Sequence, residues 1–307
     1  MLFNKTMSII QHLSDNPLFF FIIVFFFSLA VGSFLNVVIY RLPIMLKREW
    51  KSDCLGFLAE ELEDKDLQKK YSNAEDKTPF NLSVPRSRCP SCGHQISALE
   101  NIPVISWLFL RAKCSQCGTA ISIRYPLIEL TTALLSVLLA WTFGVQWFTL
   151  AAIILTWALI VLTVIDFDTQ LLPDNITLPF LWLGILLSLT GISPISLTDS
   201  VIGAIAGYMV LWTVYQLFKL VTGKEGMGFG DFKLLALLGA WLGWQALPMI
   251  LLLSALVGSI VGISLILLLG RDKNIPIPFG PYLAAAGFIA LLWGDQIKQA
   301  YFTYMSL

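Results

Sequence analysis

Charged side chains are scarce in this sequence. They make up 13% of its 307 residues, whereas hydrophobic residues make up 57%, and the mean hydropathy is +0.76. Soluble domains carry about 25% charged residues, so this balance predicts an integral membrane protein with the lipid bilayer as a partner. The formal net charge is zero. No feature of the composition points to nucleic acid, and we expect no nucleic-acid partner.

Several catalytic motifs are missing as well. The sequence has no nucleophile elbow, no His-Glu-x-x-His metal motif and no Gly-Lys-Ser/Thr phosphate loop. The stretch GMGFGD at 226–231 superficially resembles a nucleotide-binding loop. A dinucleotide fingerprint requires a preceding strand and a βαβ unit, and neither is present around this stretch. These absences argue against serine hydrolases, zinc peptidases and nucleotide-binding enzymes.

Apolar residues gather in runs long enough to cross a membrane as helices, which takes about 20 residues. We expect about eight spans, at 18–40, 127–143, 147–165, 175–192, 199–221, 232–247, 249–269 and 276–294. Two pairs of runs are nearly continuous, split only at 144–146 and 245–248, so six or seven spans remain an alternative. The first run is too long for a signal peptide and lacks a basic leader. We interpret it as a retained span.

The basic residues lie unevenly along the chain. Eighteen of the 20 Lys and Arg fall in the segment 41–124 or in the turns near 219–233 and 271–273, which eight spans place on one side of the membrane. Because cytoplasmic loops carry the excess of Lys and Arg, this side is predicted to be the cytoplasm. Lys5 and Lys298 fall on the other side, so both termini are predicted to be periplasmic.

A polar insert with two Cys-x-x-Cys motifs separates the first two runs. Each pair is followed by glycine, and 21 residues separate the pairs; the four cysteines are Cys89, Cys92, Cys114 and Cys117. Four thiolates in two tight turns match the tetrahedral coordination of Zn²⁺, and a site made of four cysteines is structural because it leaves no position for water. Redox dithiols or disulfides are the alternative, but a cytoplasmic location disfavours them. Cys54 has no partner at metal-ligand spacing. His94 is expected to be a surface residue, and a fifth metal ligand is the alternative.

Carboxylates within membrane spans are costly and usually functional. Asp231 ends the GMGFGD stretch at the start of one span, and Asp166 directly follows the apolar run of another. Both are predicted to lie at the cytoplasmic face. Asp168 lies nearer to water as a supporting or merely interfacial carboxylate, and Asp174 is placed to cap the next helix.

Two carboxylates at one membrane depth can form a catalytic dyad. Like charges at close range do not both ionise readily, so the pair shares one proton. One carboxylate then acts as a base toward water and the other as an acid toward the carbonyl oxygen or the leaving nitrogen. The glycines at 226, 228 and 230 leave room for an extended peptide beside Asp231. Alternatively, they form a flexible turn and Asp231 is a helix cap.

The chain as a whole resembles the bacterial type IV prepilin peptidases. The segments that carry the resemblance are GSFLNVVIYRLP (32–43), RSRCPSCGHQISALENIPVISWLFLRAKCSQCG (86–118), RYPLIEL (124–130), DFDTQLLPDNITLP (166–179), GMGFGDFKLLALLGAWLG (226–243) and PFGPYLA (278–284). The resemblance implies an aspartic endopeptidase that removes the basic leader of type IV prepilins or type II secretion pseudopilins at the cytoplasmic side of the bacterial inner membrane. It also implies N-methylation of the new amino terminus with S-adenosylmethionine.

The same resemblance assigns roles to individual residues. It implies that Asp166 and Asp231 are the catalytic pair. Around them we expect five supporting residues, namely Gly228, Gly230, Asp168, Asp174 and Lys233. The cysteine-bearing insert agrees with the methylating members of the family. Glu129 is a weak candidate for binding the cofactor or substrate, with an interfacial carboxylate as the alternative.

The sequence therefore predicts an all-α polytopic membrane protein in three parts. These are a first transmembrane segment (1–43), a cytoplasmic zinc-ribbon-like insert (44–125) between the first two helices, and a peptidase core (126–307). Two other functional classes remain open. A proton-coupled transporter also uses intramembrane carboxylates, and an assembly factor without catalytic activity would use the insert to dock a partner.

Overall fold

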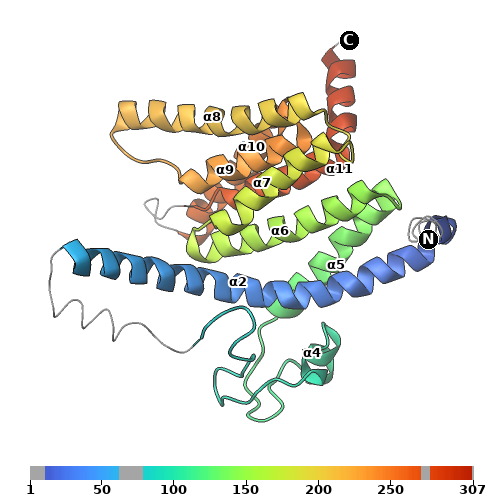
Figure 1. Cartoon of the computed structure of the whole chain (residues 1–307), viewed down its shortest axis with the longest axis vertical. Coiled ribbons are helices and arrows are strands. Elements are labelled where there is room, and N and C mark those ends of the chain that lie inside the picture. Colours follow the sequence, from blue (N-terminus) through green and yellow to red (C-terminus); the bar gives the residue numbers. More distant parts are fainter. Residues whose placement is uncertain (1–10, 62–78, 271–276, 306–307) are drawn as a thin grey trace. The chain divides into compact units, whose positions relative to one another are not determined.

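A computed structural model describes residues 11–61, 79–270 and 277–305. This part of the chain is helical and contains no β-strand. The longer helices, labelled in Figure 1, are α2 (Pro17–Glu61), α5 (Arg124–Phe143), α6 (Trp147–Thr169), α7 (Asp174–Leu189), α8 (Leu197–Thr222), α9 (Phe229–Leu242), α10 (Leu247–Leu269) and α11 (Gly280–Met305). Short helices lie at Leu99–Asn101 (η1), Ile105–Phe109 (α4) and Trp244–Ala246 (η2). The all-α class is confirmed.

Each of the eight predicted apolar runs coincides with one of the longer helices. Among the residues that the structure describes, five helical segments are long and apolar enough to cross a membrane, namely Pro17–Leu58, Arg124–Phe143, Trp147–Thr169, Leu197–Thr222 and Trp244–Leu268. Helix α7 is apolar but shorter, and α9 has 14 residues. About five candidate spans therefore follow from length and composition.

Several helix boundaries depart from the predicted runs, and three of the differences bear on the two acids and on the insert. Helix α2 continues beyond residue 40, past Pro43, to Glu61, although a proline inside a helix removes one backbone hydrogen bond. Helix α6 continues to Thr169 and α9 begins at Phe229. Asp166 and Asp231 therefore lie within the end turns of helices and not in the connecting loops.

The chain divides into two compact units. One comprises Met1–Val24 with Leu135–Leu307, and the other is Phe25–Leu134. In the first unit α9 is the central helix: every residue from Asp231 to Leu242 is buried except Lys233. Helix α9 contacts α7, α8, α10 and α11. The apolar packing of α9 thus holds Asp231 in a fixed position.

Helices α8 and α9 approach each other closely at a pair of glycines. A Cβ built on Gly239 would overlap the carbonyl group of Gly203, and one on Gly207 would lie 2.6 Å from the carbonyl oxygen of Leu235. Small residues of this kind allow helix backbones in membranes to pack directly against each other.

Replacing Gly239 with alanine should therefore destabilise the protein. The added methyl group must separate α8 from α9, and overpacking of this kind costs about 1–3 kcal/mol. We expect thermal unfolding in detergent roughly 2–10 °C lower than for the unmodified protein. Gly294→Ala in α11 is the matched control, because its nearest neighbour would be the Met249 methyl group at 3.8 Å. Equal unfolding temperatures for the two variants would contradict the proposed contact.

In the second unit, α2 and α5 cross at Gly32. A Cβ on Gly32 would lie 2.7 Å from Cα of Glu129, and Asn36 Nδ2 donates to the Tyr125 carbonyl oxygen at 3.2 Å. Further along α2, the buried Arg41 guanidinium donates to the carbonyl oxygen of Asn81 at 2.8 Å. These bonds attach the start of the described insert to α2.

Candidate active site and metal centre

The two predicted catalytic carboxylates come from helix ends in the first unit. Asp166 lies in the last turn of α6 and Asp231 in the first turn of α9, and their exposed fractions are 5% and 8%. The backbone before Asp231, at Gly230, and the hydrogen-bond donor of Asp166, Gly280, both lie against the side chain of Leu172. The fold thus brings together two buried acids that are 65 residues apart in the sequence.

Gly280 completes the surroundings of Asp166. Its backbone N–H donates to Asp166 Oδ2 at 3.1 Å, and a Cβ on Gly280 would lie only 2.6 Å from that same oxygen. A side chain at this position would therefore displace the carboxylate. The sequence patterns assigned no role to Gly280, although it lies within the PFGPYLA segment at 278–284.

Leu172 connects the segments that carry the two acids. A Cβ on Gly230 would lie 2.8 Å from the Leu172 Cβ, and one on Gly280 would lie 3.2 Å from the Leu172 Cδ1. Leu172 is therefore wedged between the glycine before Asp231 and the glycine that binds Asp166. This contact was not predicted either, because a lone leucine in an apolar sequence carries no recognisable signal.

The predicted supporting residues lie in different parts of the site. Lys233 Nζ lies 2.7 Å from both carboxylate oxygens of Asp174, and this ion pair joins α9 to α7. The predicted capping role of Asp174 is wrong. Pro173 is the N-cap of α7, and Asp174 is the first helical residue with its carboxylate on Lys233. Asp168 is exposed, and Gly228 is the N-cap of α9.

Space beside Asp231 is available at Gly228. A Cβ on this residue would meet only Asp231 Oδ2, at 3.9 Å. The glycine pair is thus asymmetric, because Gly230 is tightly packed and Gly228 is not. Asp231 lies in the first turn of α9, where a carboxylate interacts favourably with the helix dipole. That location agrees in part with the capping alternative, but capping does not explain the neighbouring acid, Asp166.

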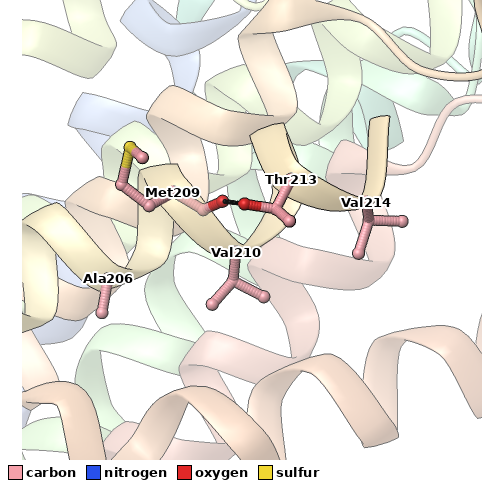
Figure 2. A pocket seen from close by; sticks show the side chains of 5 residues that line it. All are labelled: Ala206, Met209, Val210, Thr213 and Val214. Atoms are coloured by element: carbon pink, nitrogen blue, oxygen red, sulfur yellow. Dashed lines mark hydrogen bonds between the residues drawn. The ribbon is translucent and has the colours of Figure 1, made fainter. Parts of the chain in front are cut away.

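A shallow apolar groove on α8 is separate from these acids. It is lined by Ala206, Met209, Val210, Thr213 and Val214 (Figure 2). The Thr213 hydroxyl donates to the Met209 carbonyl oxygen at 2.7 Å, so its proton is used within α8 itself. No charged side chain lines the groove. The groove therefore lacks the groups for acid–base chemistry.

In the second unit, the four predicted metal ligands converge. Their sulfur atoms all lie within 4.8 Å of one another. Sγ of Cys89 and Sγ of Cys117 are 3.7 Å apart, and those of Cys92 and Cys114 are 4.0 Å apart. A tetrahedral Zn²⁺ with bonds of about 2.3 Å separates its sulfurs by about 3.8 Å, so the arrangement fits this ion.

The two cysteine turns have the same backbone geometry. Gly93 N–H donates to the Cys89 carbonyl oxygen and Gly118 N–H donates to that of Cys114. The φ angles of these glycines are +72° and +71°, in the left-handed region that glycine tolerates best. Isolated antiparallel bridges at Arg88–Gln95 and Lys113–Ala120 close the two turns. The glycine after each cysteine pair is thus a geometric requirement.

Hydrogen bonds surround the cysteine cluster and link its two halves. The Thr119 hydroxyl and backbone N–H lower the pKa of the Cys117 thiol to about 6. The Glu100 carboxylate accepts hydrogen bonds from the Ser115 hydroxyl and the Ser97 N–H, and these lower its pKa to about 2. Glu100 also lies 3.2 Å from His94 Nε2. His94 is therefore occupied by Glu100 and is not a fifth ligand.

Glu129, the weak cofactor candidate, is buried in α5. Its Oε2 accepts the N–H of Val104 at 2.7 Å. Val104 has a φ of 59° and a ψ of −48°, which is a strained combination for a β-branched residue. The carboxylate thus supports a strained turn of the insert.

The chain matches two family descriptions, the Bacterial Peptidase A24 N-terminal domain over residues 26–143 and the Type IV leader peptidase family over residues 153–263. It is 59% identical to the prepilin leader peptidase/N-methyltransferase of Aeromonas hydrophila over 94% of this chain and 95% of that protein. Proteins of the same name from Stutzerimonas stutzeri and Pseudomonas aeruginosa are 52% and 51% identical over 98% and 97% of this chain, and 100% and 99% of their own. No solved structure is significantly similar to the chain.

Proposed function

The chain belongs to the type IV leader peptidase family, and on this basis we propose that it is a bifunctional prepilin leader peptidase and N-methyltransferase. It cleaves the basic leader from type IV prepilins or pseudopilins and then methylates the new amino terminus. The observation that supports the peptidase half is the burial of Asp166 and Asp231 at two helix ends whose neighbouring glycines, Gly280 and Gly230, both lie against Leu172.

The proposed reaction is hydrolysis by an aspartate dyad. One carboxylate takes a proton from water, which attacks the carbonyl carbon of the scissile peptide bond. The protonated partner donates to the carbonyl oxygen, and the leaving nitrogen is protonated as the bond breaks. The Gly280 N–H holds Asp166 in place, and the Lys233–Asp174 ion pair fixes the neighbouring helix ends. Leu172 and Gly230 keep the two acid-bearing segments together.

S-adenosylmethionine is proposed as the donor of the methyl group. The support for this step is the name shared by the relatives. The Glu129 carboxylate already accepts the Val104 N–H, which favours the structural alternative for this residue.

We infer a structural Zn²⁺ ion held by Cys89, Cys92, Cys114 and Cys117. The sulfur separations of 3.7 and 4.0 Å and the convergence of all four sulfurs within 4.8 Å support this assignment. Four thiolates leave the ion no open position. Its role is to hold the two cysteine turns of the insert together.

The proposed topology has eight spans, with the insert 44–125 between the first two and the peptidase core at 126–307. The protein is a multi-pass membrane protein, and the eight long helices support the higher span count. The clustering of 18 of the 20 basic residues supports an inner-membrane orientation with the insert and both acids facing the cytoplasm and both termini in the periplasm.

Mass spectrometry of a pilin-like precursor tests both activities together. Incubation with the purified protein should remove the leader, and S-adenosylmethionine should add one methyl group to the cleaved product. An unchanged precursor mass would rule out the peptidase. Cleavage without methylation would limit the proposal to the peptidase half.

A further inference from the structure

Part of the insert is unexpectedly apolar and exposed. Residues 101–110 (NIPVISWLFL) contain no ionisable side chain, although they lie within the segment predicted to be cytoplasmic. They include α4, on which Leu108 is 61% exposed and Phe109 is 84% exposed, with Ile105 at 45%. Large apolar side chains grouped in this way indicate an interaction surface.

The hydrogen bond between Val104 and Glu129 sets the depth of α4. Helix α5 has 20 residues, which at 1.5 Å per residue is about the thickness of the hydrocarbon core. Glu129 lies five residues after the start of α5, or about 7.5 Å along the helix axis. Val104, the residue immediately before α4, is therefore held beside the second turn of α5. At the same level, α5 crosses α2 at Gly32.

The chain returns toward the cysteine cluster after α4. Trp107 Nε1 donates to the Ile121 carbonyl oxygen at 3.1 Å, and the Ile121 N–H donates to the Ala112 carbonyl oxygen at 2.7 Å. Ile121 precedes α5, which begins at Arg124. The segment 104–121 therefore lies at the level of Glu129 at its start and outside the first turn of α5 at its end. The exposed side chains of Arg111 and Lys113 lie on the return.

We propose that α4 and its flanking residues 102–110 are immersed in the interfacial layer of the phospholipid bilayer. Acyl chains cover Ile105, Leu108 and Phe109, while Arg111 and Lys113 bind lipid phosphates. Interfacial helices lie about 5–10 Å deep with basic residues at the headgroups, which agrees with the depth set by Glu129. Part of the insert is therefore a membrane anchor.

Lipid is favoured over a protein partner because the span to which Val104 is bonded also exposes large apolar side chains. Leu127, Leu130 and Leu134 on α5 are also exposed large apolar residues. In a membrane helix such residues face lipid. The Glu129 carboxylate acts here as a positioning group, since it holds the strained Val104 turn that directs α4 toward this depth. The inference depends on the helices and not on the proposed catalytic activity.

A fluorescent coumarin amino acid at position 109 tests the proposal in the full-length protein. Phe109 is largely exposed, so its replacement removes little packing. The protein is reconstituted in phosphatidylcholine–phosphatidylglycerol vesicles whose acyl chains carry bromine, a short-range quencher. We expect the lipid bromine to quench roughly half or more of the fluorescence at 109, as for a group buried about 5–10 Å deep, and iodide in the buffer to have little effect.

Val84 is the matched control site. It is apolar and exposed and belongs to the same insert. Its carbonyl oxygen accepts the N–H of Asn81, whose own carbonyl oxygen accepts from Arg41 on α2. Arg41 lies five residues after Asn36, or about 7.5 Å farther along α2. The label at 84 should respond to iodide and not to bromine. Quenching of the 109 label by iodide alone would overturn the proposal. The proposal would also fail if a pilin-like apolar peptide, and not lipid, were needed to protect the 109 label from iodide.

Discussion

Replacing Asp231 with asparagine is expected to reduce leader-peptide cleavage by roughly 10²–10⁴-fold, the range that general acid–base catalysis contributes. The amide has nearly the same shape as the carboxyl group but can neither accept a proton from water nor share one with Asp166. Asp231 is buried in the first turn of α9. The measurement is the initial rate of conversion of a purified prepilin in detergent, followed by mass.

Asp295→Asn is the matched control for this substitution. Asp295 is also a helical carboxylate, but its side chain is 87% exposed and forms an ion pair with Lys298 at 3.5 Å. Cleavage by this variant should match that of the unmodified protein. Cleavage by Asp231→Asn at the normal rate would mean that the dyad hypothesis is wrong. The transporter and the assembly factor would then be the remaining functional classes.

Methylation provides a second readout of the Asp231 variant. If the methyl-transfer site is separate from the dyad, Asp231→Asn should still methylate a pilin whose leader has already been removed. Retained methylation with lost cleavage would show that the variant is folded. Loss of both activities together with a lower unfolding temperature would instead identify a structural defect, and Asp166→Asn would then have to test the dyad.

Replacing Cys114 with serine should remove the bound metal, from one zinc ion per chain to close to none. A cysteine thiol loses its proton when it binds zinc, whereas a serine hydroxyl does not ionise at neutral pH. The site therefore loses one of its four charged ligands. Zinc binding contributes roughly 10 kcal/mol or more to the folding of small zinc modules. The cysteine turns should therefore become susceptible to proteolysis. Elemental analysis of the purified protein and limited digestion measure the two effects.

Cys54→Ser is the control for the zinc prediction. Cys54 is an exposed thiol on α2 and is not one of the four clustered cysteines. Its replacement should leave the metal content at one ion per chain. A Cys114→Ser protein that retained a full equivalent of zinc would contradict the assignment of the four ligands.

The elements that could be predicted from sequence are those with a local physical cause. The apolar runs had to become helices because an unpaired backbone cannot remain in a bilayer, and breaks at Gly144 and near Gln245 appear as predicted between α5 and α6 and between α9 and α10. Each Cys-x-x-Cys motif forms a tight turn with its following glycine because that geometry is encoded within five residues. Depth along the apolar runs was enough to single out Asp166 and Asp231.

Other features depended on contacts between distant segments. The Gly280 N–H bond to Asp166 spans 114 residues, and the Lys233–Asp174 ion pair spans 59. Asp174 was expected to cap α7 because aspartate is a good N-cap, but the nearby lysine and the preceding proline determine its position instead. Such pairings cannot be predicted from local propensity, since either partner could equally well face water.

The sequence by itself determined that this is an all-helical membrane protein with a four-cysteine cluster and two acids near the ends of apolar helices, because hydrophobicity and turn chemistry are local properties. Only the tertiary structure decided which groups surround those acids. It wedges Leu172 between Gly230 and Gly280, and it binds the Val104 turn to Glu129 so that α4 lies beside a span. The physical reason is close packing, which places residues in contact according to shape and available space and not according to their distance along the chain.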